Sequence, residues 1–185
     1  MRLFHFSDDT NIDVFMPRPV TVPVSRLHWQ ERLNEPLVWA IDDWHQAMYL
    51  FPRDCPRIFV WPTESTTPEY VTAYKKMTSC RMVAHIELGW LDRLSHTAVY
   101  RYELAPGGFE QLGDAGMWVS SAPTMPVNVE RIDNMEKALS EAGVELRVLP
   151  SLKTLAPLWE TSLHVSGIGL RHAKGGPIAP PRLVN

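Results

Sequence analysis

Leu3-Phe4-His5-Phe6-Ser7 and Leu37-Val38-Trp39-Ala40-Ile41 are the two stretches that decide the fold of this chain. Each is a run of apolar and aromatic residues with the length of a buried strand, and each is followed by hydroxyl or carboxylate residues that favour a turn or the start of a helix. The polar side chains expected at the two strand ends are His5, Ser7, Asp42 and Asp43. This arrangement predicts a pocket formed by residues 1–51.

The length of 185 residues predicts one domain with a substantial core. The formal net charge of -3 and the pI near 6.2 give no general attraction to nucleic-acid phosphates or anionic lipid. No stretch reaches the roughly 18 apolar residues of a membrane-spanning helix, and the first residues lack the apolar core of a signal peptide. Because Cys55 and Cys80 are too few for a disulfide framework or a zinc site, we expect a cytoplasmic protein.

Short strands and helices follow one another irregularly along the chain. Apolar or alternating runs predict strands at residues 57–61, 82–88, 99–104, 117–120 and 144–149, and the alternation at 82–88 predicts a half-buried strand. Helices are predicted from Asp42 or Asp43 to Phe51, from Thr67 to about Lys76, and over residues 128–142, where apolar residues recur at intervals of three and four. Prolines predict an extended loop over residues 18–25.

These elements predict an α+β fold. We expect a single domain over residues 1–166, with a mixed or mostly antiparallel sheet of six or seven short strands and three or four helices. A tail rich in glycine and proline follows at residues 167–185. A doubly wound nucleotide fold is disfavoured, because Gly167-Ile168-Gly169 lacks the third glycine and the helix of a phosphate-binding loop.

The first third of the chain resembles the ADP-ribosyltransferase-like fold. The resemblance rests on the histidine of Leu3-Phe4-His5-Phe6-Ser7 and on the aromatic second strand Val38-Trp39-Ala40, which leads to Tyr49. In that family a histidine anchors the NAD ribose, a tyrosine stacks on the nicotinamide, and a glutamate supports the oxocarbenium-like transition state. The resemblance therefore implies NAD as the cofactor and cleavage of the nicotinamide glycosidic bond.

The same resemblance implies a set of site residues. The residues expected to bind the nucleotide are His5, Ser7, Arg18, Trp39 and Tyr49. The late strand of the family pattern, here residues 116–120, carries no glutamate, so the catalytic acid is expected at Glu103 or Glu145. Without a carboxylate at the pocket, the mechanism would lose its largest electrostatic contribution.

A second resemblance covers most of the chain. It is to a family of uncharacterised bacterial proteins that open with Leu-Tyr-His-Phe-Ser, which corresponds here to residues 3–7. The similarity continues into Val-Trp-Ala-Ile-Asp at residues 38–42 and Phe-Pro-Arg-Asp-Cys-Pro at residues 51–56. This resemblance implies no activity.

The singled-out residues also have structural interpretations. His5 fits a core histidine bonded to a backbone carbonyl, and Tyr49 fits an ordinary residue of an amphipathic helix. Asp42 and Asp43 fit helix caps. Metal binding is not expected, because the Asp42-x-x-His45 pair supplies at most two ligands.

Two function classes therefore stay open. One is an ADP-ribosyltransferase-like enzyme, and the other is a non-catalytic ligand-binding or interaction protein that keeps the fold without the catalytic glutamate. The expected partner is a small nucleotide. Nucleic acid is not expected, because the basic residues gather only in the tail, where aromatic side chains for base stacking are lacking. The seven tryptophans and sixteen prolines are compatible with a contact between two copies of the chain.

Overall fold

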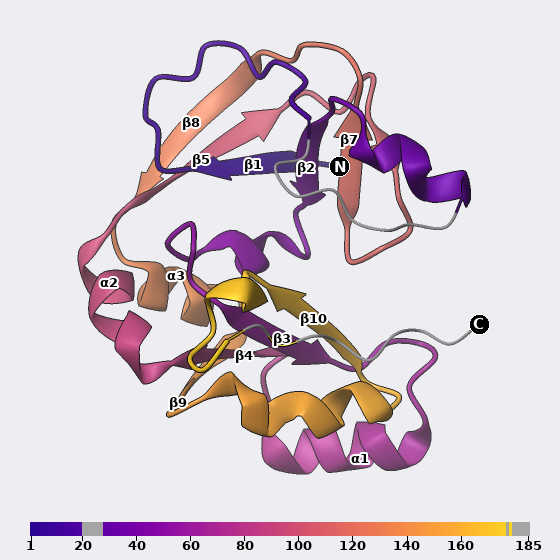
Figure 1. Cartoon of the computed structure of the whole chain (residues 1–185), viewed down its shortest axis with the longest axis vertical. Coiled ribbons are helices and arrows are strands. Elements are labelled where there is room, and N and C mark those ends of the chain that lie inside the picture. The colour runs from indigo at the N-terminus through magenta and orange to yellow at the C-terminus, as the bar shows by residue number, and fades with distance from the viewer. Residues whose placement is uncertain (20–27, 177, 179–185) are drawn as a thin grey trace. The chain divides into compact units, whose positions relative to one another are not determined.

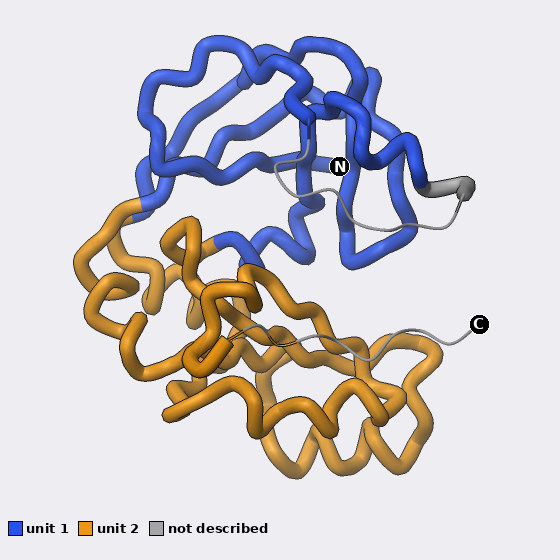
Figure 2. The backbone as a smooth tube through the Cα atoms, viewed as in Figure 1, with its two compact units in different colours: residues 1–49, 99–132 blue, residues 50–98, 133–185 orange. Residues whose placement is uncertain are grey.

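Ten strands in two sheets are present in the residues described by the computed structural model, which are residues 1–19, 28–176 and 178. Figure 2 divides the chain into two compact units. Unit 1 holds residues 1–49 and 99–132, and unit 2 holds residues 50–98 and 133–185. The chain thus leaves unit 1, builds part of unit 2, returns, and leaves again.

Unit 1 contains a six-stranded antiparallel sheet in the order β6-β7-β2-β1-β5-β8 (Figure 1). Its strands are β1 (Leu3–Ser7), β2 (Val38–Asp42), β5 (Val99–Leu104), β6 (Glu110–Gln111), β7 (Met117–Ser120) and β8 (Pro126–Ile132). Two 3-10 turns, η1 (His28–Asn34) and η2 (Gln46–Tyr49), flank β2 in the sequence. Leu3, Tyr102 and Leu104 pack with Phe15 to form the main apolar cluster.

Unit 2 contains a four-stranded sheet in the order β10-β3-β4-β9, in which only the β4 and β9 pair is parallel. Its strands are β3 (Arg57–Trp61), β4 (Met82–Glu87), β9 (Val144–Leu149) and β10 (His164–Ile168). Its helical segments are α1 (Pro68–Met77), η3 (Leu88–Trp90), α2 (Leu91–His96), α3 (Met135–Glu141), η4 (Leu152–Glu160) and η5 (Leu170–His172). Tyr74 of α1 and Leu152 of η4 pack against Ile58 and Val60 of β3, on the side of the sheet where Figure 1 draws both helical segments.

The α+β class and the mostly antiparallel pairing are confirmed, whereas the expected six or seven strands were too few. The helix α1 begins directly after the predicted cap Thr67 and carries Lys75 and Lys76 in its last turn. The mostly antiparallel sheet in itself does not establish the ADP-ribosyltransferase-like topology. No helix in the described part of the chain is long and apolar enough to cross a membrane.

The helix predicted over residues 128–142 is wrong for its first half. Residues 126–132 form β8, which pairs with β5, and α3 begins only at Met135. The side chain of Asn134 caps this helix by accepting a hydrogen bond from the Lys137 N–H at 2.8 Å. The apolar residues whose spacing predicted one helix therefore belong to a strand and to a helix. Within the strand, Val129 is 48 % exposed and Ile132 is buried.

Two further expectations, for the segment after Asp42 and for the strand β4, were wrong. After Asp42 the chain forms a turn and the single 3-10 turn η2 in place of a longer helix. The strand β4 is buried along its whole length, because it lies between β3 and β9 in the middle of its sheet. A central strand with both faces covered does not show the burial alternation that its sequence predicted.

The segment rich in glycine and proline begins inside β10 and continues into η5. Leu170, Ala173 and Ile178 belong to the core of unit 2, so the first part of this segment is integral to the fold. The domain boundary expected at residue 166 stays a prediction. Residues 177 and 179–185, and most of the loop expected at residues 18–25, lie outside the described residues.

Candidate functional site

The two faces of the unit 1 sheet carry different sets of side chains. Side chains alternate along a strand, and residues directly opposite each other on neighbouring strands share a face. Phe4 is opposite Ile41 on β2 and Glu103 on β5, while His5 is opposite Tyr102. Phe4 and Glu103 therefore lie on one face of the sheet, and His5 and Tyr102 lie on the other.

A small pocket opens on the face that carries Phe4. Its volume is about 60 Å³, and its lining residues are Phe4, His5, Phe6, Trp39, Ala40, Ile41, Tyr49 and Met117. The rings of Phe6 and Tyr49 are nearly parallel, with an angle of 21° and a centroid distance of 6.2 Å. The Tyr49 hydroxyl points to the Met117 sulfur at 3.8 Å. The lining is thus almost entirely aromatic and apolar.

His5 borders this pocket, but its side chain is directed elsewhere. Its Nδ1 forms a hydrogen bond of 2.8 Å with the carbonyl oxygen of Trp39, and its ring lies 4.6 Å from that of Phe15. Phe15 belongs to the apolar cluster on the Tyr102 face. His5 is thus a half-buried histidine bonded to a backbone carbonyl, and that hydrogen bond is the one expected in the structural interpretation of the sequence.

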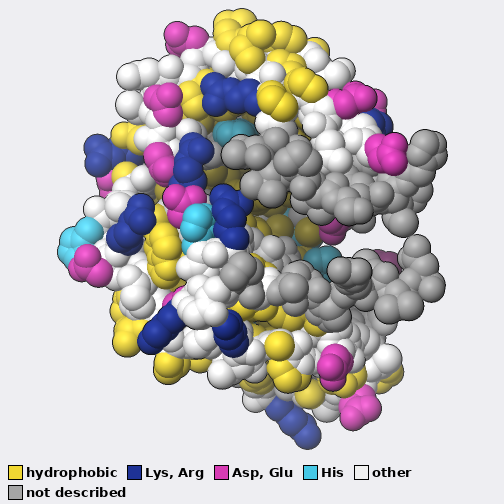
Figure 3. Space-filling model, viewed as in Figure 1, with side chains coloured by type: hydrophobic (Ala, Val, Ile, Leu, Met, Phe, Trp, Pro, Cys, Tyr) yellow, Lys and Arg dark blue, Asp and Glu magenta, His cyan; other side chains and the backbone are white. Residues whose placement is uncertain are grey.

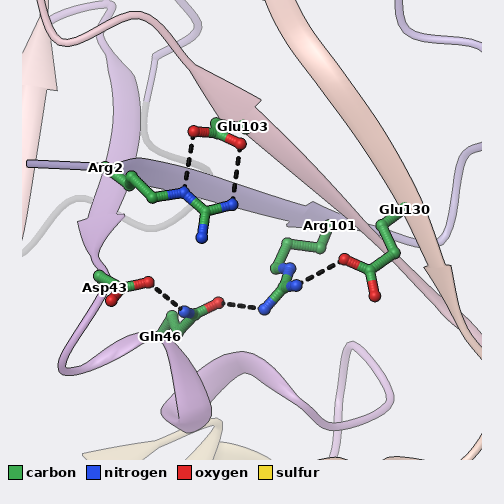
Figure 4. Close-up of polar contacts among 6 residues, drawn as sticks. All are labelled: Arg2, Asp43, Gln46, Arg101, Glu103 and Glu130. Atoms are coloured by element: carbon green, nitrogen blue, oxygen red, sulfur yellow. Dashed lines mark hydrogen bonds and ion pairs between the residues drawn. The ribbon is translucent and has the colours of Figure 1, made fainter.

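Arg2 and Arg101, which lie over the ring of Phe4, belong to a set of six polar residues whose contacts are drawn in Figure 4. They are Arg2, Asp43, Gln46, Arg101, Glu103 and Glu130. Arg2 donates two hydrogen bonds of 2.9 Å to the two carboxylate oxygens of Glu103. Arg101 donates to Glu130 at 2.5 Å and to the Gln46 side-chain oxygen at 2.8 Å, and Gln46 donates to Asp43 at 2.8 Å.

Both guanidinium groups of this set lie over the ring of Phe4. The central carbon of Arg2 is 4.9 Å from the ring centroid, and that of Arg101 is 5.1 Å away. Cations at this distance are attracted by the negative face of an aromatic ring. Phe4 therefore joins the apolar pocket to the charged residues around it.

The two carboxylates expected to act as the catalytic acid lie in different units. The hydrogen bond from Arg2 is the main reason that the pKa of Glu103 is lowered, so this side chain is a carboxylate at neutral pH. Glu145 belongs to unit 2, where the Arg147 side chain donates to it at 2.7 Å and lowers its pKa in the same way. Of the two, Glu103 is the one on the strand next to Phe4.

The remaining expected residues have mostly backbone or structural contacts. Ser7 is buried, and its hydroxyl oxygen accepts a hydrogen bond of 3.1 Å from the Asp9 N–H. Arg18 is exposed, and its backbone pairs with that of Leu37 at 3.1 and 3.2 Å. Of the five residues expected to bind a nucleotide, Trp39 and Tyr49 bring their rings to the pocket.

Asp42 and His45 form a second polar feature of unit 1. Asp42 Oδ1 accepts hydrogen bonds of 2.8 Å from both the backbone N–H and the Nδ1 of His45. Burial alone would raise the pKa of Asp42, but these hydrogen bonds outweigh it and lower the pKa. The aspartate thus acts as a cap, as the sequence indicated, although it caps a turn. Among the described residues, no three histidine, cysteine or carboxylate side chains lie together as a metal site would require.

The sequence interpretation missed Arg2 and Arg101, which the structure places at the pocket. The available signal was local, since a basic residue occurs within or beside each of two strands with aromatic neighbours, Arg2-Leu3-Phe4 and Tyr100-Arg101-Tyr102. That both reach the same phenylalanine follows only from the pairing of β1 with β5.

No curated protein and no solved structure matches this chain. The chain does match a family of unknown function, DUF6886, over residues 4–173. The matched region contains every lining residue of the pocket and, apart from Leu3 of β1, every strand residue of both sheets. The protein belongs to the DUF6886 family.

Proposed function

We propose that the protein binds a small organic ligand in the unit 1 pocket and does not convert it chemically. The observation that carries this proposal is the lining, in which Phe4, Phe6, Trp39 and Tyr49 surround an open volume of about 60 Å³. Ligand sites are typically apolar and aromatic with a few polar groups beside them, and the residues around Phe4 supply such groups.

The size of the pocket limits what enters it. Sites that enclose a whole drug-sized ligand hold roughly 300–1,000 Å³. A cavity that encloses benzene measures about 150 Å³, so a pocket of about 60 Å³ takes only a small group, such as the edge of a single flat ring, and the rest of the ligand stays outside. The nicotinamide ring of NAD is one such group. The nucleotides that the sequence implied as ligands are therefore among the compounds to test.

The contacts of Glu103 favour binding over catalysis. Both of its carboxylate oxygens accept hydrogen bonds from Arg2. A carboxylate that stabilises an oxocarbenium-like transition state must place an oxygen against the reacting carbon. The fork with Arg2 holds both oxygens at the guanidinium instead.

Cleavage of the nicotinamide glycosidic bond is the second candidate. It is favoured by one observation, which is that Glu103 is opposite Phe4 and so lies on the pocket face of the sheet. In this function Glu103 would leave Arg2 and face the ribose.

Calorimetry with nicotinamide, NAD and ADP-ribose tests the proposal. We expect heat from nicotinamide or NAD and none from ADP-ribose, which lacks the nicotinamide ring and offers only the larger, two-ring adenine. Tyr49→Ala should weaken binding at least about fivefold, because a stacked ring contributes roughly 1–3 kcal/mol. Trp44→Ala is the matched control, since Trp44 is 43 % exposed and does not line the pocket.

The absence of heat from all three compounds at millimolar concentration, with protein that melts cooperatively, contradicts the proposal for this ligand class. Mass spectrometry of the NAD mixture separates the two candidates. Nicotinamide released by the wild type but not by Glu103→Gln would establish cleavage in place of simple binding.

A further inference from the structure

The charges of the residues beside the pocket do not sum to zero. Arg2 and Arg101 contribute two positive charges, whereas Asp43, Glu103 and Glu130 contribute three negative charges, which leaves one excess negative charge. Each guanidinium already has a carboxylate partner, at 2.9 Å for Arg2 and 2.5 Å for Arg101. A phosphate or carboxylate of a ligand would have to displace one of these partners and would then meet the remaining carboxylates.

The aromatic side chains that line the pocket also favour a cationic ligand. The Phe4 ring is already engaged by the guanidinium groups of Arg2 and Arg101, so a ligand cation would meet the other rings of the pocket. Phe6, Trp39 and Tyr49 line the same space, and the soft sulfur of Met117 completes it. Aromatic rings grouped in this way, with a carboxylate close by, are the usual means of binding methylated ammonium groups.

We propose that the pocket binds a methylated ammonium group, with the rings of Phe6, Trp39 and Tyr49 around its methyl groups and Glu103 as the nearest anion. This inference rests on the proposed binding function and specifies the class of ligand. The ammonium carries its charge inside a shell of methyl groups, so it gains contact with an apolar lining and attraction from the carboxylates at the same time. A neutral group of the same shape gains only the apolar contact.

Choline and its neutral isostere 3,3-dimethylbutanol separate these two contributions. Ligand-observed NMR on the full chain follows the methyl signal of each compound, and a titration gives each dissociation constant. We expect choline to bind at least about fivefold more tightly than the isostere, since a cation close to aromatic rings gains roughly 1 kcal/mol. Inorganic phosphate, added as an anionic probe, should not compete with choline.

The variant Glu103→Gln removes the charge at nearly constant shape. It should weaken choline binding roughly three- to tenfold and leave binding of the neutral isostere unchanged. The control is Glu141→Gln, because Glu141 also has a cationic partner, Lys137, but belongs to unit 2, which contributes none of the residues that line the pocket.

The outcomes keep this inference apart from the proposed function. Equal affinity for choline and the isostere would overturn the preference for a cation while leaving the pocket as a binding site. Failure of both compounds to bind would overturn the cation preference and count against the pocket itself. If Glu103→Gln melts earlier than the wild type, Asp43→Asn provides the same charge removal at the exposed end of the network. A weakening by Glu141→Gln equal to that by Glu103→Gln would also contradict the inference.

Discussion

Gly116 lies directly against the side chain of His45. A Cβ atom at position 116 would come within 2.6 Å of Asp42 Oδ2 and even closer to His45 Nδ1, and the φ angle of Gly116 is +70°. Both the backbone conformation and the space therefore require glycine, and the pair of Asp42 and His45 depends on this close approach.

Replacement of Gly116 tests this relationship. Gly116→Ala should lower the free energy of unfolding by about 2–4 kcal/mol, because it adds a clash to the roughly 1–2 kcal/mol of left-handed backbone strain. Gly113→Ala isolates the strain, since its φ is +69° with nothing within 4 Å, and Gly107→Ala has neither effect. Urea denaturation of the three variants should rank them in this order, and equal losses for Gly113→Ala and Gly116→Ala would contradict the steric argument.

His85 predicts a loss of stability in mild acid. Burial lowers the pKa of this histidine below its ordinary value of 6.5, although the Ile58 carbonyl, 3.2 Å from Nδ1, opposes the shift. As the pH falls below about 6.5, the unfolded chain binds a proton that the folded chain does not, so stability decreases by up to about 1.4 kcal/mol per pH unit.

The measurement is the free energy of unfolding in urea between pH 7.5 and 5, compared for the wild type and His85→Gln. The difference between the two should shrink as the pH falls. His96→Gln is the control, because the His96 side chain is 74 % exposed. A difference in unfolding free energy that stays constant over this range would show that His85 takes up a proton as readily in the folded chain as in the unfolded one.

The burial of Cys55 and Tyr74 predicts that the folded protein loses stability at alkaline pH. Burial raises the pKa of the Cys55 thiol from 9.0 to about 12 and that of the Tyr74 hydroxyl from 10.0 to about 12. Between about pH 9 and pH 12 the unfolded chain releases protons that the folded chain retains, so stability decreases as the pH rises. Denaturation at pH 8 and pH 10.5 should show a smaller loss for Cys55→Ala than for the wild type.

Thiol labelling provides a kinetic check on the same residue. At pH 8 a thiol with a pKa near 12 is almost entirely protonated, and Cys55 is also buried whereas Cys80 is partly exposed, so a reagent should modify Cys80 long before Cys55. The variant Cys80→Ser should therefore resist labelling until denaturant is added. Rapid modification of folded Cys80→Ser would mean that the Cys55 site opens readily.

Glu87 fixes two backbone segments of unit 2. It is buried, one oxygen accepts a hydrogen bond of 3.1 Å from the Leu152 N–H, and the other accepts one of 2.8 Å from the Lys174 N–H. Glu87→Gln replaces one acceptor by a donor that faces an N–H group, which should cost about 1–3 kcal/mol of stability. Hydrogen exchange should accelerate at Leu152 and Lys174, whereas Glu69→Gln on the exposed start of α1 should change neither.

Runs of apolar residues predicted β1, β2, β3 and β5 within about one residue, because these strands are short and bounded by polar residues or proline. The strand β8 could not be predicted in this way, since its residues 126–131 are largely exposed and its identity depends on pairing with β5. The local pattern shows which residues are apolar, but it does not show which distant strand forms the hydrogen bonds.

The same distinction applies to the candidate site. Alternation in Leu3–Ser7 separates Phe4 and Phe6 from His5, but aromatic or apolar residues occur on both faces, so the sequence does not show which face holds the pocket. Trp39 and Tyr49 were expected at the site from the resemblance to the ADP-ribosyltransferase-like fold, and both line the pocket. The contacts of Arg2 with Glu103 join residues that are 101 positions apart in the chain, and no local pattern predicts such a pair.

The division of the sequence between the two units constrains the order in which the chain can fold during synthesis. When residue 98 has been made, unit 1 has only β1 and β2, and a two-stranded ribbon is marginally stable in water. The other four strands of its sheet all come from residues 99–132. The first strand of the protein must therefore wait for β5 before its second edge is paired, and a ribosome that stalls between the two would hold a chain in which neither sheet is complete.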